Sequence, residues 1–150
     1  MTTEPVNVHA TAIVVGKTGL LFVGPSGWGK SMLAFACITE AQRIGIEAAL
    51  VADDQVMMSV HGAEVMAVCP PAIAGLIELR GTGIVTLASV GPSVMHYAIV
   101  PAQTTGSLRL PPDDEMFVVA PGIELPAIRL LANVPFPLAV LMAKAADIGR

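Results

Sequence analysis

The chain of 150 residues is long enough to bury one hydrophobic core, and we expect a single domain over residues 1–150. It is 54% hydrophobic and 13% charged, but its longest apolar run, residues 136–143, is far shorter than the roughly 20 residues of a membrane-spanning helix, which argues against a membrane protein. A net charge of −4 and the absence of any Lys/Arg run argue against nucleic acid as the main partner.

The N-terminal residues and the cysteines predict a cytoplasmic protein. The first ten residues, MTTEPVNVHA, lack a basic segment followed by an apolar stretch, so no signal peptide is expected. Cys37 and Cys69 show no C-x-x-C spacing. We therefore expect both to be buried free thiols in a reducing compartment rather than metal or redox ligands.

The first part of the chain predicts a β-hairpin followed by a helix. Residues 11–16 (TAIVVG) are β-branched and apolar and predict a strand, residues 20–23 predict a second strand, and residues 17–19 have the composition of a tight turn. Residues 31–44 have helical composition without Gly or Pro, and Gly45 is expected to end that helix.

The middle of the chain predicts more strands, most of them joined by short turns. The turn at His61-Gly62 predicts a second hairpin, and the two prolines that begin residues 70–76 predict a short helix or turn. The predicted strands are residues 48–52, 56–60, 64–68 and 95–100, with a strand-like segment at 77–87 that Gly81 and Gly83 interrupt.

The last third of the chain predicts a polar loop and a closing helix. Residues 104–114 are polar and contain prolines, which favours a mobile loop, and residues 137–148 have helical composition. Strands outnumber helices, and several strands are joined as hairpins. The sequence therefore predicts an α/β domain with a mixed sheet rather than a doubly wound parallel one.

The octapeptide GPSGWGKS satisfies the phosphate-loop pattern G-x-x-x-x-G-K-[ST], with a predicted strand before it and a helix after it. Its glycines let backbone N–H groups surround an anion, and the helix N-terminus adds its dipole. Lys30 can reach the outer phosphates, and the Ser31 hydroxyl can ligate Mg²⁺. Trp28 either packs on neighbouring backbone, which we favour, or stacks on a base or a partner. The expected nucleotide-binding residues are Gly24, Pro25, Ser26, Gly27, Trp28, Gly29, Lys30 and Ser31.

The segment LVADDQV places Asp53 and Asp54 at the end of a predicted apolar strand. Near a phosphate loop, one carboxylate can hold Mg²⁺ or its water shell, and the other can take a proton from an attacking hydroxyl. A solvated turn is the alternative. No NKxD-type element of a GTPase is visible, and motor-type ATPases are usually longer than this chain.

Four segments in this order, HATAIVV, GPSGWGKS, LVADDQV and IELRGTGIV, resemble the catalytic domain of bacterial HPr kinase/phosphorylase over roughly residues 9–87. The resemblance implies an enzyme that uses ATP and Mg²⁺ to phosphorylate a serine of HPr, the phosphocarrier of the sugar phosphotransferase system. It also implies removal of that phosphate by inorganic phosphate with release of pyrophosphate. The implied fold is a P-loop kinase domain with a mixed sheet, similar to phosphoenolpyruvate carboxykinase.

The resemblance also implies which residues handle the proton and the metal. His9 matches the active-site histidine of the family. Asp54 matches the carboxylate that takes the serine proton, and Asp53 is expected to support it. Ser31 and Glu78 match the metal ligands.

Cationic residues are expected to neutralise the charge of the transferred phosphate. Lys30 matches the loop lysine of the family, Arg80 lies in the segment IELRGTGIV, and Arg109 is a candidate for a further catalytic arginine.

The chain also departs from the family pattern. The family's usual N-terminal domain is absent from this chain. The family's C-terminal loop, of the P-x-R-P-G-R type and tied to dephosphorylation, has its nearest match in GIELPAIRL, with Pro126 and Arg129. This leaves the dephosphorylation direction open. A small-molecule kinase and a non-catalytic nucleotide-binding regulatory protein remain the alternatives. The apolar surplus predicts a homo-oligomer, a hexamer by resemblance.

Overall fold

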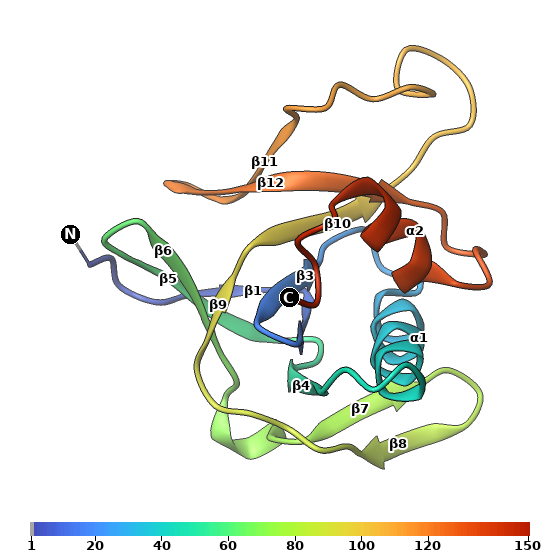
Figure 1. The fold of residues 1–150 in the computed structure, drawn as a ribbon. Coiled ribbons are helices and arrows are strands. Elements are labelled where there is room, and N and C mark those ends of the chain that lie inside the picture. Colours follow the sequence, from blue (N-terminus) through green and yellow to red (C-terminus); the bar gives the residue numbers. More distant parts are fainter. Residues whose placement is uncertain (1) are drawn as a thin grey trace.

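The computed structural model describes residues 2–150, which form a six-stranded mixed sheet with a second sheet on one face and helices on the other (Figure 1). The strand order of the large sheet is β11-β12-β10-β3-β2-β4. Strand β10 runs parallel to both β3 and β12, and the other pairs are antiparallel. The expected α/β domain with a mixed sheet is therefore confirmed. Its strands are β2 (Thr11–Val15), β3 (Thr18–Phe22), β4 (Ala48–Ala52), β10 (Tyr97–Pro101), β11 (Met116–Ala120) and β12 (Ile123–Leu130).

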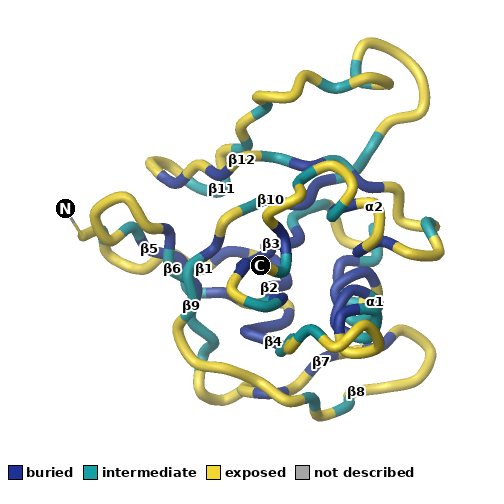
Figure 2. The backbone as a smooth tube through the Cα atoms, viewed as in Figure 1, coloured by how far each residue is buried: buried dark blue, intermediate teal, exposed yellow. Residues whose placement is uncertain are grey.

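The smaller sheet is antiparallel and covers one face of the large sheet. Because successive side chains of a strand point to opposite faces, Ala12 and Leu21 of the large sheet face the small sheet, where they pack with Met58. Figure 2 shows the buried strands at the centre of the molecule. The order of the small sheet is β1-β5-β6-β9, with β1 at Val6–Val8, β5 at Val56–His61, β6 at Glu64–Val68 and β9 at Ser93–Met95.

Two helices, α1 (Lys30–Arg43) and α2 (Pro137–Lys144), cover the other face of the large sheet. Ile13 and Phe22 point to this side and share a core with Leu33 of α1 and Leu138 of α2. Helix α2 has no capping side chain of its own. Instead the Glu40 carboxylate of α1 accepts hydrogen bonds from the N–H groups of Leu138 and Ala139, at 2.9 and 3.2 Å. An anion at this position also interacts favourably with the helix dipole of α2.

A separate hairpin, β7 (Leu76–Leu79) and β8 (Gly83–Thr86), follows a short 3₁₀ helix at Pro71–Ile73. Ile77 and Leu79 are buried in the core beneath α1. The alternate residues of β7 are exposed and therefore face away from that core.

The local pattern of the first half of the chain predicts its elements closely. The predicted strand at 48–52 coincides with β4, and the predicted helix at 31–44 lies within one residue of α1 at each end. The predicted turn at 17–19 is misplaced, because Thr18 already pairs with Val15 and the turn is Gly16-Lys17. Gly16 has a φ of 61°, and a Cβ there would lie 2.7 Å from the carbonyl oxygen of Gly149.

Three predictions for the second half are wrong or incomplete. The segment predicted as one strand at 95–100 is two strands, because the chain leaves the small sheet and enters the large sheet at His96. The predicted helix at 137–148 ends at Lys144, since Ala145 is extended. The local pattern does not predict β11 and β12, nor, in the first half of the chain, β1. Residues 104–114 form neither helix nor strand, in agreement with a loop.

The segment GIELPAIRL, the nearest match to the family's C-terminal loop, is not a loop. It forms β12, with its side chains alternating between core and surface. Arg129 donates hydrogen bonds to both carboxylate oxygens of Glu115, at 3.0 and 2.6 Å, and to the carbonyl of Pro101 at 2.9 Å. The hydrogen bonds from Arg129 hold the pKa of the Glu115 carboxyl below its usual range. Arg129 thus joins β10, β12 and the segment before β11.

The structure also tests the expectations about the cysteines and about membrane-spanning helices. Both cysteines are free thiols, as expected. The expected burial is found for Cys37, whereas Cys69 is only half-buried. Burial raises the pKa of both thiols. No helix among residues 2–150 is long and apolar enough to cross a membrane.

The C-terminal residues are fastened to the large sheet by Tyr97, which predicts an alkaline loss of stability. Its hydroxyl donates to Asp147 at 2.8 Å, and partial burial together with this bond raises the pKa of Tyr97 to about 12 from 10. The folded state therefore holds this proton more tightly than the unfolded state. The resulting contribution to the free energy of unfolding is present below pH 10 and is lost as the pH rises toward 12.

We expect Tyr97→Phe to remove this part of the pH dependence. Urea unfolding of both proteins on either side of pH 10 would measure it, and the difference between them should shrink as the pH rises. Both proteins carry the same lysines, so the lysine titration cancels in the comparison. A difference that stays constant through this range would contradict the prediction.

Candidate active site

The phosphate loop connects β3 to α1 and has a backbone that requires its glycines. Gly27 and Gly29 have φ values of 87° and 102°, in the left-handed region where a side chain would be strained. Gly29 caps α1, whose first N–H groups have no partner within the helix and so face the loop as donors. Lys30 is only 8% exposed, and its ammonium donates to the carbonyls of Gly24 and Pro25 at 3.0 and 3.3 Å. The lysine is thus held against the loop itself.

Trp28 packs at the base of the loop. It is half-buried against the core beneath the helices, which favours the packing alternative over an exposed stacking role. A Cβ at Gly24 would lie 2.7 Å from Cε3 of Trp28 and 3.1 Å from Cγ of Pro101, so only glycine fits there. Trp28 therefore fixes the start of the loop.

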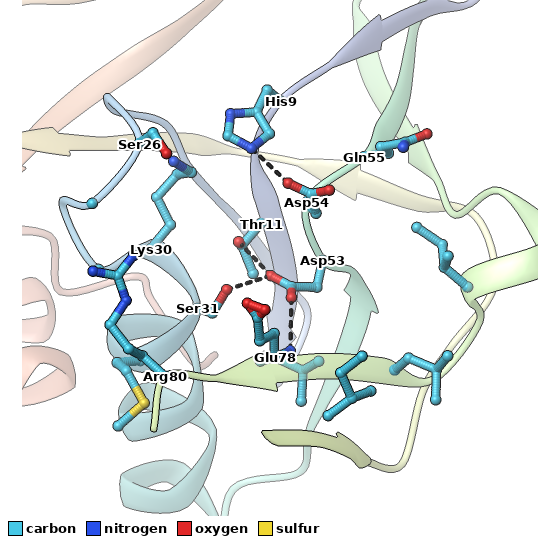
Figure 3. A pocket seen from close by; sticks show the side chains of 17 residues that line it. His9, Thr11, Ser26, Lys30, Ser31, Asp53, Asp54, Gln55, Glu78 and Arg80 are labelled. Carbon is cyan, nitrogen blue, oxygen red and sulfur yellow. Dashed lines mark hydrogen bonds and ion pairs between the residues drawn. The ribbon is translucent and has the colours of Figure 1, made fainter. Parts of the chain in front are cut away.

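Asp53 is the most densely bonded side chain of the site. It is 6% exposed at the end of β4, and its Oδ1 accepts hydrogen bonds from the hydroxyls of Ser31 at 2.6 Å and Thr11 at 2.9 Å (Figure 3). Its Oδ2 accepts the backbone N–H of Glu78 at 3.0 Å. Asp53 thereby ties together β2, β4, β7 and the first turn of α1. Since Ser31 donates its proton to Asp53, the lone pairs of the serine oxygen remain available to a cation.

Asp54, the next residue, has the opposite environment. Its φ is 71°, a region that aspartate tolerates better than most residues, and this backbone turns the side chain away from the core. Its Oδ1 lies 2.5 Å from Nε2 of His9, and both side chains are more than half exposed. Two adjacent carboxylates are therefore split, with Asp53 held internally and Asp54 accessible to a substrate.

Most of the predicted site residues line one cavity. Its volume, about 360 Å³, is within the usual range for small-molecule sites. Glu78 and Arg80 of the β7–β8 hairpin face the two aspartates and the phosphate loop across it (Figure 3). The predicted residues that line the cavity are His9, Ser26, Gly27, Gly29, Lys30, Ser31, Asp53, Asp54, Glu78 and Arg80.

Four predicted residues do not line the cavity. Gly24 and Pro25 accept the hydrogen bonds of Lys30 through their carbonyls, and Trp28 packs against Gly24. Arg109 is exposed in the loop between β10 and β11, where its N–H donates to the carbonyl of Gly106. The structure therefore does not bring Arg109 to the other site residues.

Thr11 is a residue of the site that the sequence did not reveal. It is fully buried, lines the cavity and donates to Asp53. The available signal was a hydroxyl residue within the apolar strand segment HATAIVV, but such a residue is equally compatible with an ordinary buried threonine.

The oxygen atoms around Ser31 suit a hard cation. Residues 2–150 contain no cluster of three or more His, Cys, Asp or Glu side chains that could enclose a metal. The Ser31 hydroxyl, Asp53 and Glu78 instead offer a partial set of oxygen ligands on one side of the cavity. Mg²⁺ commonly takes one or two carboxylates and completes its shell with water and phosphate oxygens, so these residues fit it.

A phosphate loop between a strand and a helix, with two aspartates at a neighbouring strand end, is typical of α/β domains of the P-loop class. Residues 2–94 match the model of the HPr Serine kinase C-terminal domain, and the chain belongs to this family. The family resemblance of the four sequence segments is therefore confirmed.

One known protein resembles this chain in sequence and another in fold. The HPr kinase/phosphorylase of Mycoplasmopsis pulmonis (strain UAB CTIP) is 35% identical over 87 residues, which cover 58% of this chain and 26% of that protein. The match thus spans about a quarter of the relative's length. The structure of the Hpr(Ser) kinase/phosphatase from Coxiella burnetii shares the fold, with a TM-score of 0.75, 22% identity and 95% of both chains covered.

Proposed function

We propose that this domain transfers the γ-phosphoryl group of ATP to a serine hydroxyl of HPr, with Mg²⁺ as the metal. The observation that carries the proposal is the single cavity in which the phosphate loop, the Ser31–Asp53 pair and the His9–Asp54 pair meet. The names of the two relatives support HPr as the acceptor.

The phosphate loop would hold the nucleotide. The N–H donors of the loop and of the α1 N-terminus suit the β- and γ-phosphates. The Lys30 ammonium, which donates to two loop carbonyls, would donate to a phosphate oxygen instead when the nucleotide is bound. Ser31, Asp53 and Glu78 would hold Mg²⁺, which neutralises phosphate charge when bound. Arg80 faces the same space and adds a second protein cation.

Asp54 would receive the proton of the serine. The serine oxygen forms a bond to the γ-phosphorus, the bond from phosphorus to the β–γ bridging oxygen breaks, ADP leaves, and the serine proton passes to the Asp54 carboxylate. His9 keeps that carboxylate in place through their contact of 2.5 Å. The reverse transfer to inorganic phosphate, with release of pyrophosphate, would use the same groups, since Asp54 can return the proton.

The oligomeric state stays a prediction. Large apolar side chains are exposed on several elements, which agrees with subunit contacts, and light scattering would determine the subunit number. Examples are Val6, Leu110, Met116, Val118, Phe136 and Val140.

Mass spectrometry of HPr incubated with this protein, Mg²⁺ and ATP tests the proposed function. We expect a single phosphoserine. A second aliquot, given inorganic phosphate in place of ATP, should lose it with release of pyrophosphate. A phosphoserine that persists would identify a kinase without the reverse reaction. Unmodified HPr would contradict the proposal and favour another acceptor or a nucleotide-binding protein without transfer activity.

Thr11 provides a prediction about the metal. Thr11→Val keeps the shape of the side chain but removes the hydroxyl that Asp53 accepts at 2.9 Å, so Asp53 and the Ser31 hydroxyl bonded to it should be held less firmly. We expect the Mg²⁺ concentration that half-saturates ATP binding to rise by about tenfold, as is typical when a partner of a metal ligand is lost. Calorimetric titration of ATP at several Mg²⁺ concentrations measures this.

The matched control is Thr11→Ser, which restores the hydroxyl and should restore most of the Mg²⁺ dependence. If the valine and serine variants showed the same Mg²⁺ dependence, the hydroxyl of Thr11 would have no part in holding the metal ligands.

A further inference from the structure

One wall of the cavity is apolar and exposed, whereas most of the side chains on the other walls are polar. Ile73 of the 3₁₀ helix, Leu76 of β7 and Ile84 of β8 line this wall, and we call them the apolar strip. Ile84 is 69% exposed and Leu76 is 37% exposed. Large apolar side chains that are left in water beside a reaction site favour contact with a ligand that covers them.

The order of residues along β7 gives this wall a direction. Leu76 and Glu78 occupy alternate positions of β7, so they share one face and lie about 7 Å apart, and Arg80 comes next in this order, in the turn that follows β7. Figure 3 shows Arg80 beside the phosphate loop and Glu78 beside Asp53. Leu76 comes one step further along and lies at the end of the cavity away from the phosphate loop. Ile84 is the cross-strand partner of Glu78.

This direction distinguishes the two substrates of a phosphoryl transfer. The attacking and leaving oxygens lie roughly in line on opposite sides of the transferred group. Figure 3 shows Arg80 on the side of the phosphate loop, the nucleotide end, and Asp54 away from it, so the acceptor approaches from the side of Asp54. By the order of residues along β7, Leu76 also lies away from the phosphate loop. The apolar strip thus begins where the acceptor hydroxyl has to arrive.

We propose that the apolar strip binds an apolar side chain of the acceptor polypeptide next to the serine that is phosphorylated. This inference rests on the proposed function, and it adds a recognition surface to it. The strip is continuous with the reaction cavity, so a polypeptide whose serine reaches Asp54 lies against it. An apolar neighbour of the serine would bury Leu76 and Ile84, whereas a charged neighbour would lose water there without gaining a partner.

The test compares two isoleucines of similar exposure. Ile84→Ser removes an apolar side chain from the strip, and Ile44→Ser removes one that is 61% exposed at the C-terminal end of α1, outside the cavity. We expect Ile84→Ser to raise the KM for HPr by about tenfold, since burial of such a side chain contributes at least that factor. The KM for ATP and the calorimetric affinity for ATP should not change. Ile44→Ser should match the unaltered protein in every measurement.

Leu76→Ser is the second variant and should act in the same direction as Ile84→Ser. An unchanged KM for HPr in both variants would overturn the proposal. A rise in the KM for ATP instead would also overturn it, because the strip would then hold the nucleotide base. If the unaltered protein transferred no phosphate to HPr, the proposed function would be wrong, and the apolar strip could not have the occupant assigned here. That result is visible before any variant is compared.

Discussion

Replacement of Asp54 by asparagine is expected to lower the rate of phosphoryl transfer to HPr by a factor of about a hundred to ten thousand, which is the typical effect of losing a positioned general base. The amide of asparagine cannot take the serine proton, although the side chain has nearly the same shape as that of aspartate. Asparagine also tolerates the left-handed backbone, at a φ of 71°, that directs this side chain into the cavity. The measurement is the initial rate of phosphoserine formation at saturating ATP.

ATP binding separates this effect from a damaged site. Asp54 makes no hydrogen bond to Lys30 or Ser31 within the described chain, so calorimetry should give an unchanged affinity for ATP. Asp114→Asn alters an exposed aspartate outside the cavity and should leave the rate unchanged. Transfer at the original rate by Asp54→Asn would remove Asp54 from its assigned role.

Lys30→Ala is expected to weaken ATP binding and, at saturating ATP, to lower the transfer rate by a factor on the order of a hundred to a thousand. The ammonium is held over the loop by two carbonyls at 3.0 and 3.3 Å, at the position where the outer phosphates would lie. Its charge would act on the ground state and more strongly on the transition state, in which charge spreads over the transferred group. Both the affinity and the rate should therefore fall.

Lys17→Ala is the matched control for that variant. Lys17 is exposed in the turn between β2 and β3 and does not line the cavity, so its loss changes the net charge equally without touching the site. A loss of ATP affinity with no loss of rate at saturating ATP would show that Lys30 only binds the nucleotide. Equal behaviour of the two alanine variants would exclude any specific role.

The parts of the site that could be predicted from the sequence are those set by local order along the chain. The phosphate loop lies between a strand and a helix, and Asp53 and Asp54 follow an apolar strand, so the spacing alone determines their placement. The same holds for α1 and β4, whose composition is uniform and whose ends carry clear signals.

The remaining features depend on contacts between distant segments. The hydrogen bond from Thr11 to Asp53 joins residues 42 positions apart, and no local pattern marks it. The break at His96 reflects a change of partner strand rather than a change of composition, since the surrounding residues are apolar throughout. The sequence does not indicate the path of the loop that carries Arg109, and that path leaves Arg109 outside the cavity.

Trp28 gives this molecule an internal optical reporter of its phosphate loop. It is the one tryptophan of the chain, and it packs against the loop's first glycine, Gly24. Its fluorescence therefore arises at the nucleotide end of the site and can be excited apart from the single tyrosine, Tyr97. Nucleotide binding, metal titration and the variants described above can thus be followed by the emission of the unlabelled protein, in real time and without a coupled assay.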